Sequence, residues 1–451
     1  MEVVPVMKKI KLSYTQIIAL GFLAIILLGT VLLCLPVSAR SGTMTPIHDA
    51  FFTATSATCV TGLIVFDTFT HWSLFGQIVI ITLIQIGGLG FMTVAILISM
   101  FLGRKIGLKQ RNLMQEAVNT SQIGGIVKMT RHIIFGTFFF EGIGAVLLAI
   151  RFCPEMGFTE GLYNAIFHSV SAFCNAGFDL MGKYEPFSSL TRYSGDWLVN
   201  LVIISLIVIG GIGFFVWEDI INKKFHFHTY RLHTKIVLVT TGLLIIIPAL
   251  LIFFMETSGG SLQDKGISES ILTSLFQAIT PRTAGFNTAI VPSLRDSTIL
   301  LMMTLMIIGG SPGSTAGGIK TTTFAVLLIS IGSTFKHSAH INAFRRRLDD
   351  GVLKRCCAIL IIYITLMTGA IMAICCIDNT PLKDTAFEVA SAIGTVGIST
   401  GITPDLSMWS QFILSGLMYF GRVGCLTMIF AFADVKGTSP VQLPLEKISI
   451  G

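Results

Sequence analysis

Two long stretches of this chain contain no charged residue, and they restrict its fold more than any other feature. The first lies between Lys11 and Arg40, and the second lies between Asp67 and Arg104. A helix rises about 1.5 Å per residue, so roughly 20 apolar residues cross a hydrocarbon layer about 30 Å thick. Charged residues make up only 12% of the chain, against roughly 25% in soluble proteins. We therefore expect a membrane protein that crosses the bilayer several times.

The basic residues occupy alternate connections between the apolar runs. Lysine and arginine cluster near the N-terminus and in segments 104–131, 223–235 and 336–355, whereas acidic residues concentrate in the connections between them. Cytoplasmic connections carry the excess of positive charge in membrane proteins. The pattern predicts a multi-pass protein of the cell (plasma) membrane, surrounded by membrane lipid, with both termini cytoplasmic. It also explains the net charge of +7 without a nucleic-acid partner.

A short, semi-polar segment ending near a glycine recurs four times. The segments are Phe52–Leu63, Phe167–Phe178, Phe276–Phe286 (with one residue of slack) and Phe387–Ile398. Their glycines, Gly62, Gly177, Gly285 and Gly397, lie 115, 108 and 112 positions apart (177−62, 285−177, 397−285). An apolar span precedes and follows each segment. We predict an all-α polytopic membrane protein, with eight transmembrane helices in four helix–pore loop–helix pseudo-repeats around a central ion pore.

The same alignment divides the chain into four units. They are residues 1–127, which include a cytoplasmic connection, 128–232, 233–350 and 351–451, which include a C-terminal tail. Each short segment is too short to cross the membrane, so it is expected to enter and return on the outer side. Non-helical backbone at that depth is tolerated only where it lines protein or water. Four such loops facing one axis predict a pore lined by backbone.

The repeated glycine fits the chemistry of a dehydrated cation. Rings of backbone carbonyls replace the water shell of potassium, and glycine permits the backbone geometry that directs them inward. Thr395-Val396-Gly397 matches the Thr-Val-Gly core of potassium-channel filters. A single glycine would be explained as well by helix capping or packing. Four at one register favour a selectivity filter.

On these motifs the chain resembles the Trk/Ktr/HKT superfamily of potassium transporters, most closely the Ktr-type (KtrB-like) membrane subunit. The resemblance extends over essentially the whole chain and implies potassium uptake, with sodium as a candidate coupling ion. It also implies a homodimer regulated by a cytoplasmic nucleotide-binding ring of the KtrA/KtrC type. By this resemblance, potassium is bound at the filter by carbonyls of Val60, Thr61, Gly62, Asn175, Ala176, Gly177, Thr283, Ala284, Gly285, Thr395, Val396 and Gly397. The first three strands lack the full potassium-channel motif, so a less selective sodium/potassium pathway is the alternative.

One predicted span, the second of the third unit, is interrupted by glycine, proline and hydroxyl residues. The interrupting residues are Gly309, Gly310, Ser311, Pro312, Gly313, Ser314, Thr315, Ala316, Gly317 and Gly318. Such a run cannot remain helical through the bilayer, and in the resembling family this element is a gating loop below the filter. A phosphate-binding loop is the rival interpretation, but Ile319 stands where that motif needs lysine. An ATP-driven pump component is therefore a remote alternative, and we expect no enzyme.

Ionisable residues inside predicted spans are candidates for function, because a charge at the centre of a membrane helix costs about 2.5–3.5 kcal/mol. Glu141, Lys320 and Arg422 qualify. We expect Lys320 and Arg422 to place positive charge near the cavity under the filter and to take part in gating. Structural pairing is the alternative for Glu141 and Arg422. Arg282, beside the third strand, is expected to brace the filter.

Overall fold

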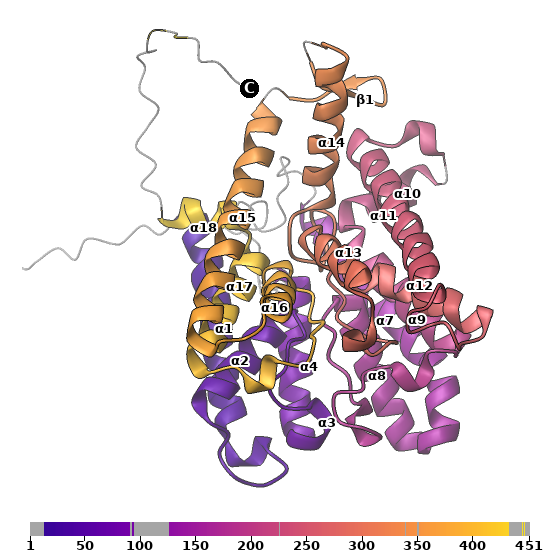
Figure 1. Ribbon diagram of the computed structural model, residues 1–451, viewed down its shortest axis with the longest axis vertical. Helices are drawn as coiled ribbons and strands as arrows, with labels where there is room; N and C mark the ends of the chain where they lie inside the picture. Colours follow the sequence, from indigo (N-terminus) through magenta and orange to yellow (C-terminus); the bar gives the residue numbers. More distant parts are fainter. Residues whose placement is uncertain are drawn as a thin grey trace, which may run out of the picture.

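The computed structural model describes residues 13–90, 93, 126–224, 226–338, 340–349, 351–432, 444 and 446. The described part is almost entirely helical, with one hairpin of two short strands, β1 Asn342–Ala343 and β2 Arg346–Arg347 (Figure 1). Within it, four helices are long and apolar enough to cross a membrane, or five if one bent pair is counted as a span. The basic segment 104–125 and most of the predicted C-terminal tail lie outside the described residues. The predicted class, an all-α polytopic membrane protein, is confirmed.

The helices follow the same order four times: a long helix, a short helix that ends before the repeated glycine, and a second apolar helix. The first and second units contain α1 Tyr14–Cys34, α2 Ile47–Thr58, α3 Thr68–His71 and α4 Leu74–Leu89, then α7 Ile126–Met156, α8 Phe158–Cys174, α9 Trp197–Gly211 and α10 Phe214–Lys223. The third and fourth contain α11 Leu232–Thr257, α12 Ile267–Ile279, α13 Asp296–Ile307 and α14 Thr321–Phe335, then α15 Gly351–Asp378, α16 Leu382–Gly394, α17 Met408–Val423 and α18 Cys425–Phe432. The short 3₁₀ helices are η1 Pro36–Ser38, η2 Met181–Lys183, η3 Thr191–Tyr193, η4 Phe227–Thr229, η5 Val291–Ser293 and η6 Thr403–Asp405. The domain division at residues 127, 232 and 350 stays a prediction.

Side-chain caps begin the second apolar helix in three units. Ser73 accepts a hydrogen bond from a backbone N–H of the first turn of α4, Asp196 does so for α9, and Ser407 does so for α17. These caps satisfy backbone donors that have no partner inside the helix. The long apolar runs thus begin as helices at defined residues on the side where the short helices enter.

A glycine with positive φ lies at or just after the end of the second apolar helix in the first, second and fourth units, and a fourth lies in the loop that follows α13 in the third unit. The glycines are Gly90 (φ 80°), Gly213 (φ 96°), Gly313 (φ 66°) and Gly424 (φ 92°). The angle between α9 and α10 is 94°. The sequence predicted an interruption only in the third unit, so the breaks at the other three glycines were not predicted. Glycine reaches this conformation without a side-chain clash, and between α9 and α10 the helix direction changes at Gly213.

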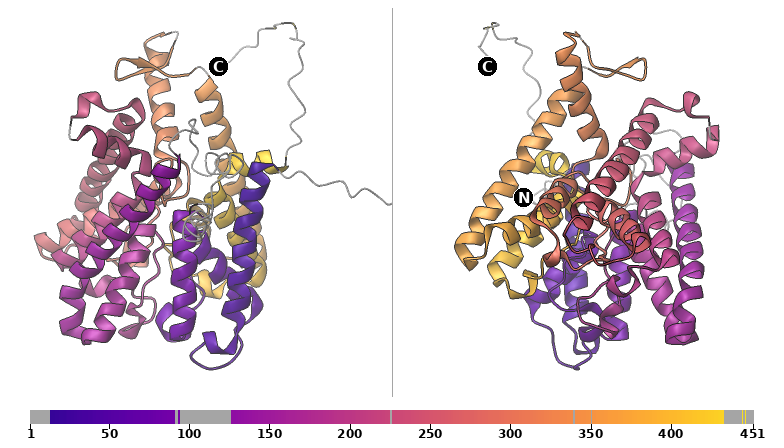
Figure 2. Two further views of the ribbon diagram at one scale, coloured as in Figure 1. Left: turned by 180° about the vertical axis from the view of Figure 1, so that it is seen from behind. Right: turned by 45° about the vertical axis from the view of Figure 1, so that its right-hand side comes forward.

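The four units pack in a closed ring. The second helix of each unit contacts the short helix of the next: α4 with α8, α9 with α12, α13 with α16, and α17 with α2. The last contact brings the C-terminal unit, drawn in orange and yellow, beside the indigo N-terminal unit (Figures 1 and 2). Inside the ring the four short helices point their C-terminal ends toward one region, which is therefore built by all four units.

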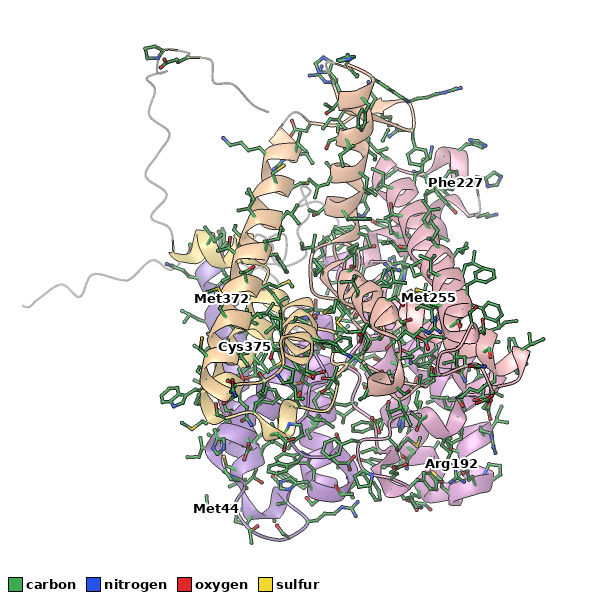
Figure 3. The ribbon with its side chains drawn as sticks, in the orientation of Figure 1. Met44, Arg192, Phe227, Met255, Met372 and Cys375 are labelled. Atoms are coloured by element: carbon green, nitrogen blue, oxygen red, sulfur yellow. The ribbon has the colours of Figure 1, made fainter. Side chains whose placement is uncertain are left out.

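The connections divide between the two ends of the molecule. Met44 and Arg192, which belong to connections after α1 and before α9, lie at one end, and Phe227 of η4 lies at the other (Figure 3). The ends of α14 and α15 and the hairpin extend beyond the end that carries Phe227 (Figure 1). The two ends therefore differ in shape, with the short helices entering from the end that carries Met44.

The tight packing of α17 leads to a stability prediction. A β-carbon at Gly421 would collide with the carbonyl oxygen of Ile393 and lie 2.9 Å from a methyl carbon of Thr395, whereas one at Gly416 would meet nothing within 4 Å. Because overpacking costs about 1–3 kcal/mol, we expect Gly421→Ala to lower the unfolding temperature of the purified protein. Gly416→Ala on the same helix is the control and should leave it unchanged or raise it. An unfolding temperature of Gly421→Ala equal to that of the unmodified protein would contradict the packing described.

Candidate ion pathway

The backbone leaves helical geometry at the same point in each unit. The residue two before the glycine has positive φ in all four: Val60 (56°), Asn175 (60°), Thr283 (74°) and Thr395 (52°). The glycines themselves have φ of 97°, 71°, 86° and 92° in chain order, and the residue between each pair does not have positive φ. Alternation of this kind is neither helix nor strand, and it allows successive carbonyl groups to face one side of the chain.

The four glycine segments lie edge to edge. A β-carbon on any of the four glycines would lie against the carbonyl oxygen of the residue before the glycine in a neighbouring unit. The pairs are Gly62 with Ala176, Gly177 with Ala284 (2.8 Å), Gly285 with Val396 (2.6 Å) and Gly397 with Thr61. The last pair closes the ring between the fourth unit and the first. Any side chain at these positions would enter the space that the carbonyls occupy, so the geometry requires glycine.

A hydroxyl residue behind each segment holds its N–H groups. The N–H before each glycine donates to the backbone oxygen of this residue: Thr61 to Ser56 (2.8 Å), Ala176 to Ser171 (2.8 Å), Ala284 to Thr280 (2.9 Å) and Val396 to Ser391 (2.8 Å). The hydroxyls of Ser56 and Ser391 also accept from the N–H of Gly62 and Gly397, both at 3.0 Å. Sequence analysis missed these four residues, although each precedes its glycine by six positions (62−56, 177−171, 397−391) or, in the third unit, by five (285−280).

The carbonyl groups of the segments accept no hydrogen bond from the part of the chain that the structure describes. None of the twelve predicted filter residues, Val60 to Gly62, Asn175 to Gly177, Thr283 to Gly285 and Thr395 to Gly397, accepts a backbone hydrogen bond at its carbonyl from the described part of the chain. All of them except Gly397 are buried. Buried carbonyls are nearly always paired, so a ring of free ones is a site for an electropositive ligand. The structure brings all twelve residues together; ion binding by them stays a prediction.

The predicted gating loop, residues 309–318, lies directly beneath this ring. A β-carbon at Gly317 would collide with the hydroxyl of Thr395, and the Thr315 hydroxyl donates to the carbonyl oxygen of Phe173 at 3.2 Å. The Ser311 N–H donates to the carbonyl oxygen of Gly211 at 3.0 Å. The loop therefore contacts the ends of two pore-facing short helices as well as the broken helix of the second unit.

Arg422 ties this loop to another unit. Its guanidinium donates to the carbonyl oxygens of Thr315 in the loop and of Gly87 and Gly88 at the end of α4, the last at 3.0 Å. Lys320 instead donates from Nζ to the carbonyl oxygen of Ala316 at 2.7 Å, within the same segment. Hydrogen bonds from a charged donor are among the stronger ones in proteins. Arg422 thus fixes the loop against the first unit, whereas the bond of Lys320 stays within the third unit.

A cavity of 730 Å³ lies on the other side of the loop. Its lining includes Pro312, Gly313, Lys320 and Arg422 but no filter residue. The loop therefore separates the cavity from the carbonyl ring. Both predicted cationic side chains face this cavity, as the sequence suggested, although their gating roles stay predictions.

Two other buried ionisable residues, Glu141 and Arg282, were candidates from the sequence. Glu141 on α7 accepts from Gln85 on α4 at 3.3 Å and lies 3.9 Å from the sulfur of Cys174, so it joins two units. Arg282 is buried, and its Nε has no hydrogen-bond partner in the described part of the chain. Neither residue is among the twelve predicted filter residues. The role of Glu141 and the bracing role of Arg282 stay predictions.

Comparison with known proteins identifies the family. Residues 13–437 match the sequence profile of the TrkH family, described as cation transport protein. The chain belongs to this family. The resemblance noted from the motifs is thereby confirmed, and the family is one of transporters and not of enzymes.

Curated relatives and a solved structure agree with this membership. The chain is 42% identical to the Ktr system potassium uptake protein B of Bacillus subtilis, over 99% of this chain and 98% of that protein. It is 40% identical to the potassium/sodium uptake protein NtpJ of Enterococcus hirae, over 98% of each. The crystal structure of the potassium transporter TrkH from Vibrio parahaemolyticus has the same fold, with a TM-score of 0.71 at 18% identity, covering 92% of this chain and 85% of that one.

The contacts of Arg422 lead to a prediction about flux. Replacing Arg422 with alanine removes the bonds that hold the loop to the first unit, so the loop should leave the pathway more often. A charged hydrogen bond contributes about 1.5–3 kcal/mol, and we expect Arg422→Ala to increase rubidium flux in proteoliposomes by about tenfold. Arg422→Lys, which keeps the charge but cannot bridge the same carbonyls, should give an intermediate flux. Unchanged flux in well-folded Arg422→Ala protein would contradict this role.

Proposed function

We propose that this protein is the membrane subunit of a Ktr/Trk-type system and takes up potassium through the ring of glycine segments. The single observation that carries the proposal is the set of segment carbonyl groups from all four units, to which none of the described residues donates a hydrogen bond. Relatives named as potassium uptake proteins support it. The proposed ion ligands are the carbonyls of the twelve filter residues.

The ring suits a monovalent cation for an electrostatic reason. Carbonyl dipoles offer partial negative charge from several directions without any formal charge, so a bound ion is attracted and can still leave. No carboxylate belongs to the twelve filter residues. A divalent ion would keep its hydration more strongly and prefers formally charged oxygen ligands. The pathway is therefore assigned to potassium, with sodium as the main competitor.

Movement of ions below the ring requires the loop to move. In the arrangement described, residues 309–318 stand between the carbonyl ring and the cavity, with Arg422 as their link to the first unit. We assign gating to this loop together with Lys320 and Arg422. Because the loop is rich in glycine, it changes conformation at low steric cost.

Assembly and orientation follow from the family and the charge pattern. We propose a homodimer in the cell membrane, with a cytoplasmic nucleotide-binding ring of the KtrA/KtrC type bound to the inner face. The positive-inside distribution places both termini in the cytoplasm. The inner face would then be the end that carries η4 and the hairpin, where Arg345, Arg346 and Arg347 are exposed.

A less selective sodium/potassium pathway is the second candidate function. It is favoured by the first three strands, which end in Val60-Thr61-Gly62, Asn175-Ala176-Gly177 and Thr283-Ala284-Gly285 and so lack the Thr-Val-Gly core of the fourth. A relative 40% identical is named a potassium/sodium uptake protein. Ion competition separates the two candidate functions. Sodium at a concentration similar to that of rubidium would block rubidium uptake only if the pathway is the less selective one.

The carbonyl ring gives a direct test by substitution. We expect purified protein in proteoliposomes to take up rubidium, and Gly285→Ser to lose most of this uptake, because its side chain would enter the space beside the Val396 carbonyl. Uptake should fall by about tenfold or more, given the cost of overpacking. Gly266→Ser in the same unit, where a β-carbon meets nothing within 4 Å, is the matched control. Rubidium flux is measured with and without sodium.

The outcomes separate the remaining possibilities. Retained selective uptake by Gly285→Ser would refute the assignment of the filter. Uptake that depends on sodium would establish sodium coupling. If the unmodified protein shows no uptake, the assay is repeated with the nucleotide-binding ring added, and continued absence of uptake would refute the proposed transport.

A further inference from the structure

Glu388 is a fully buried carboxylate in the middle of α16, close behind the fourth glycine segment. Its oxygens accept from the N–H of Thr400 at 3.0 Å, the hydroxyl of Ser399 at 2.5 Å and the hydroxyl of Thr403 at 2.7 Å. All three donors belong to the stretch that follows Gly397. A buried carboxylate is tolerated where such donors compensate its lost hydration. This carboxylate therefore holds the outer end of the fourth segment.

The contacts also exclude Glu388 as an ion ligand. Both of its oxygens face protein donors, and the side chain has no exposed surface. One turn further along α16, Ser391 accepts from the N–H of Gly397. The short helix thus holds the segment at two points, at the glycine and three residues after it. We call the second contact, from a side chain of the short helix to the N–H three residues after the glycine, the outer tether.

The second unit has the same outer tether with different chemistry. His168 lies nine residues before Gly177, as Glu388 lies nine before Gly397 (177−168, 397−388). Its Nδ1 donates to the carbonyl oxygen of Asn164 at 2.7 Å, which leaves Nε2 to accept from the N–H of Leu180 at 3.4 Å. Leu180 and Thr400 each follow their glycine by three positions (180−177, 400−397).

The first and third units have no tether of this kind in the described part of the chain. The positions three residues before Ser56 and Thr280 are Thr53 and Gln277 (56−53, 280−277), as His168 precedes Ser171 and Glu388 precedes Ser391. Both side chains are buried, and their polar atoms have no hydrogen-bond partner among the described residues. Because the ring order follows the chain, the two tethered segments face each other across the ring.

We propose that Glu388 is a positioning residue for ion selectivity, acting through Thr400 and Thr403 to fix the outer mouth of the fourth segment. With His168 it makes two opposite segments rigid and leaves the other two to adjust around the ion. Glu388 forms the stronger tether because its hydrogen bonds are charge-assisted. The inference rests on the proposed filter. Loss of the tether changes the fit of the carbonyls to an ion, and hence affinity and selectivity, more than it changes the amount of working protein.

The test compares variants in rubidium uptake into proteoliposomes, with sodium as competitor. Glu388→Gln keeps the size of the side chain but removes the charge and places a donor against donors. We expect its KM for rubidium to rise and its preference for rubidium over sodium to fall, each by about tenfold. Thr403→Val removes one donor at constant shape and should shift both quantities the same way by less. Asp264→Asn removes an exposed carboxylate from the connection before α12, in another unit, and should match the unmodified protein.

The result that overturns the proposal is an unchanged KM and ion preference in folded Glu388→Gln protein. If this variant does not fold, Thr403→Val decides in the same way, since unchanged values there also overturn it. Gly285→Ser is included to separate the two levels of inference. Retained selective uptake by Gly285→Ser would refute the filter itself. If Gly285→Ser loses uptake while Glu388→Gln and Thr403→Val keep a normal KM and ion preference, only the tether is refuted.

Discussion

The structure depends on the approach of four backbones to one axis, which is possible only where no β-carbon is present. Each repeated glycine lies against a carbonyl of a neighbouring unit, so the four segments define one another's positions. Three features hold the segments at this distance from the axis. They are the short helices, the hydroxyl residues behind the segments, and the packing of each second helix on the next short helix. A substitution that displaces one segment therefore displaces the two neighbouring segments, because each segment is positioned by its contacts with the others.

Within a bilayer no water compensates an unpaired polar group, so the hydrogen bonds of the core can be followed one by one. The segment N–H groups are taken by Ser56, Ser171, Thr280 and Ser391, and the carbonyls freed where α4 ends are taken by Arg422. The segment carbonyls are exceptions, because none of the described residues donates a hydrogen bond to them. Natural proteins keep such unpaired groups where a ligand supplies the missing partner. The ring is therefore a stronger argument for an ion site than the resemblance of any single motif.

Much of this arrangement could be predicted from the sequence, and the rest could not for identifiable reasons. The charge-free runs and the four glycines at one register are local signals, and they predicted the membrane fold and the segments that meet. The breaks at Gly213 and Gly424 were missed because glycine inside an apolar run indicates helix packing equally well. The partners of Arg422 were also missed, because Gly87 lies 335 positions away along the chain.

The contact between the last unit and the first has a consequence for biosynthesis. The hydroxyl of Tyr419 donates to the carbonyl oxygen of Ala19 at 2.6 Å, across a separation of 400 residues, and Gly397 lies against the carbonyl of Thr61. Contacts this distant in sequence form late. The ring therefore closes only after the fourth unit has left the ribosome and entered the bilayer. A chain truncated before the fourth unit lacks one of the four segments and so contains no complete ring.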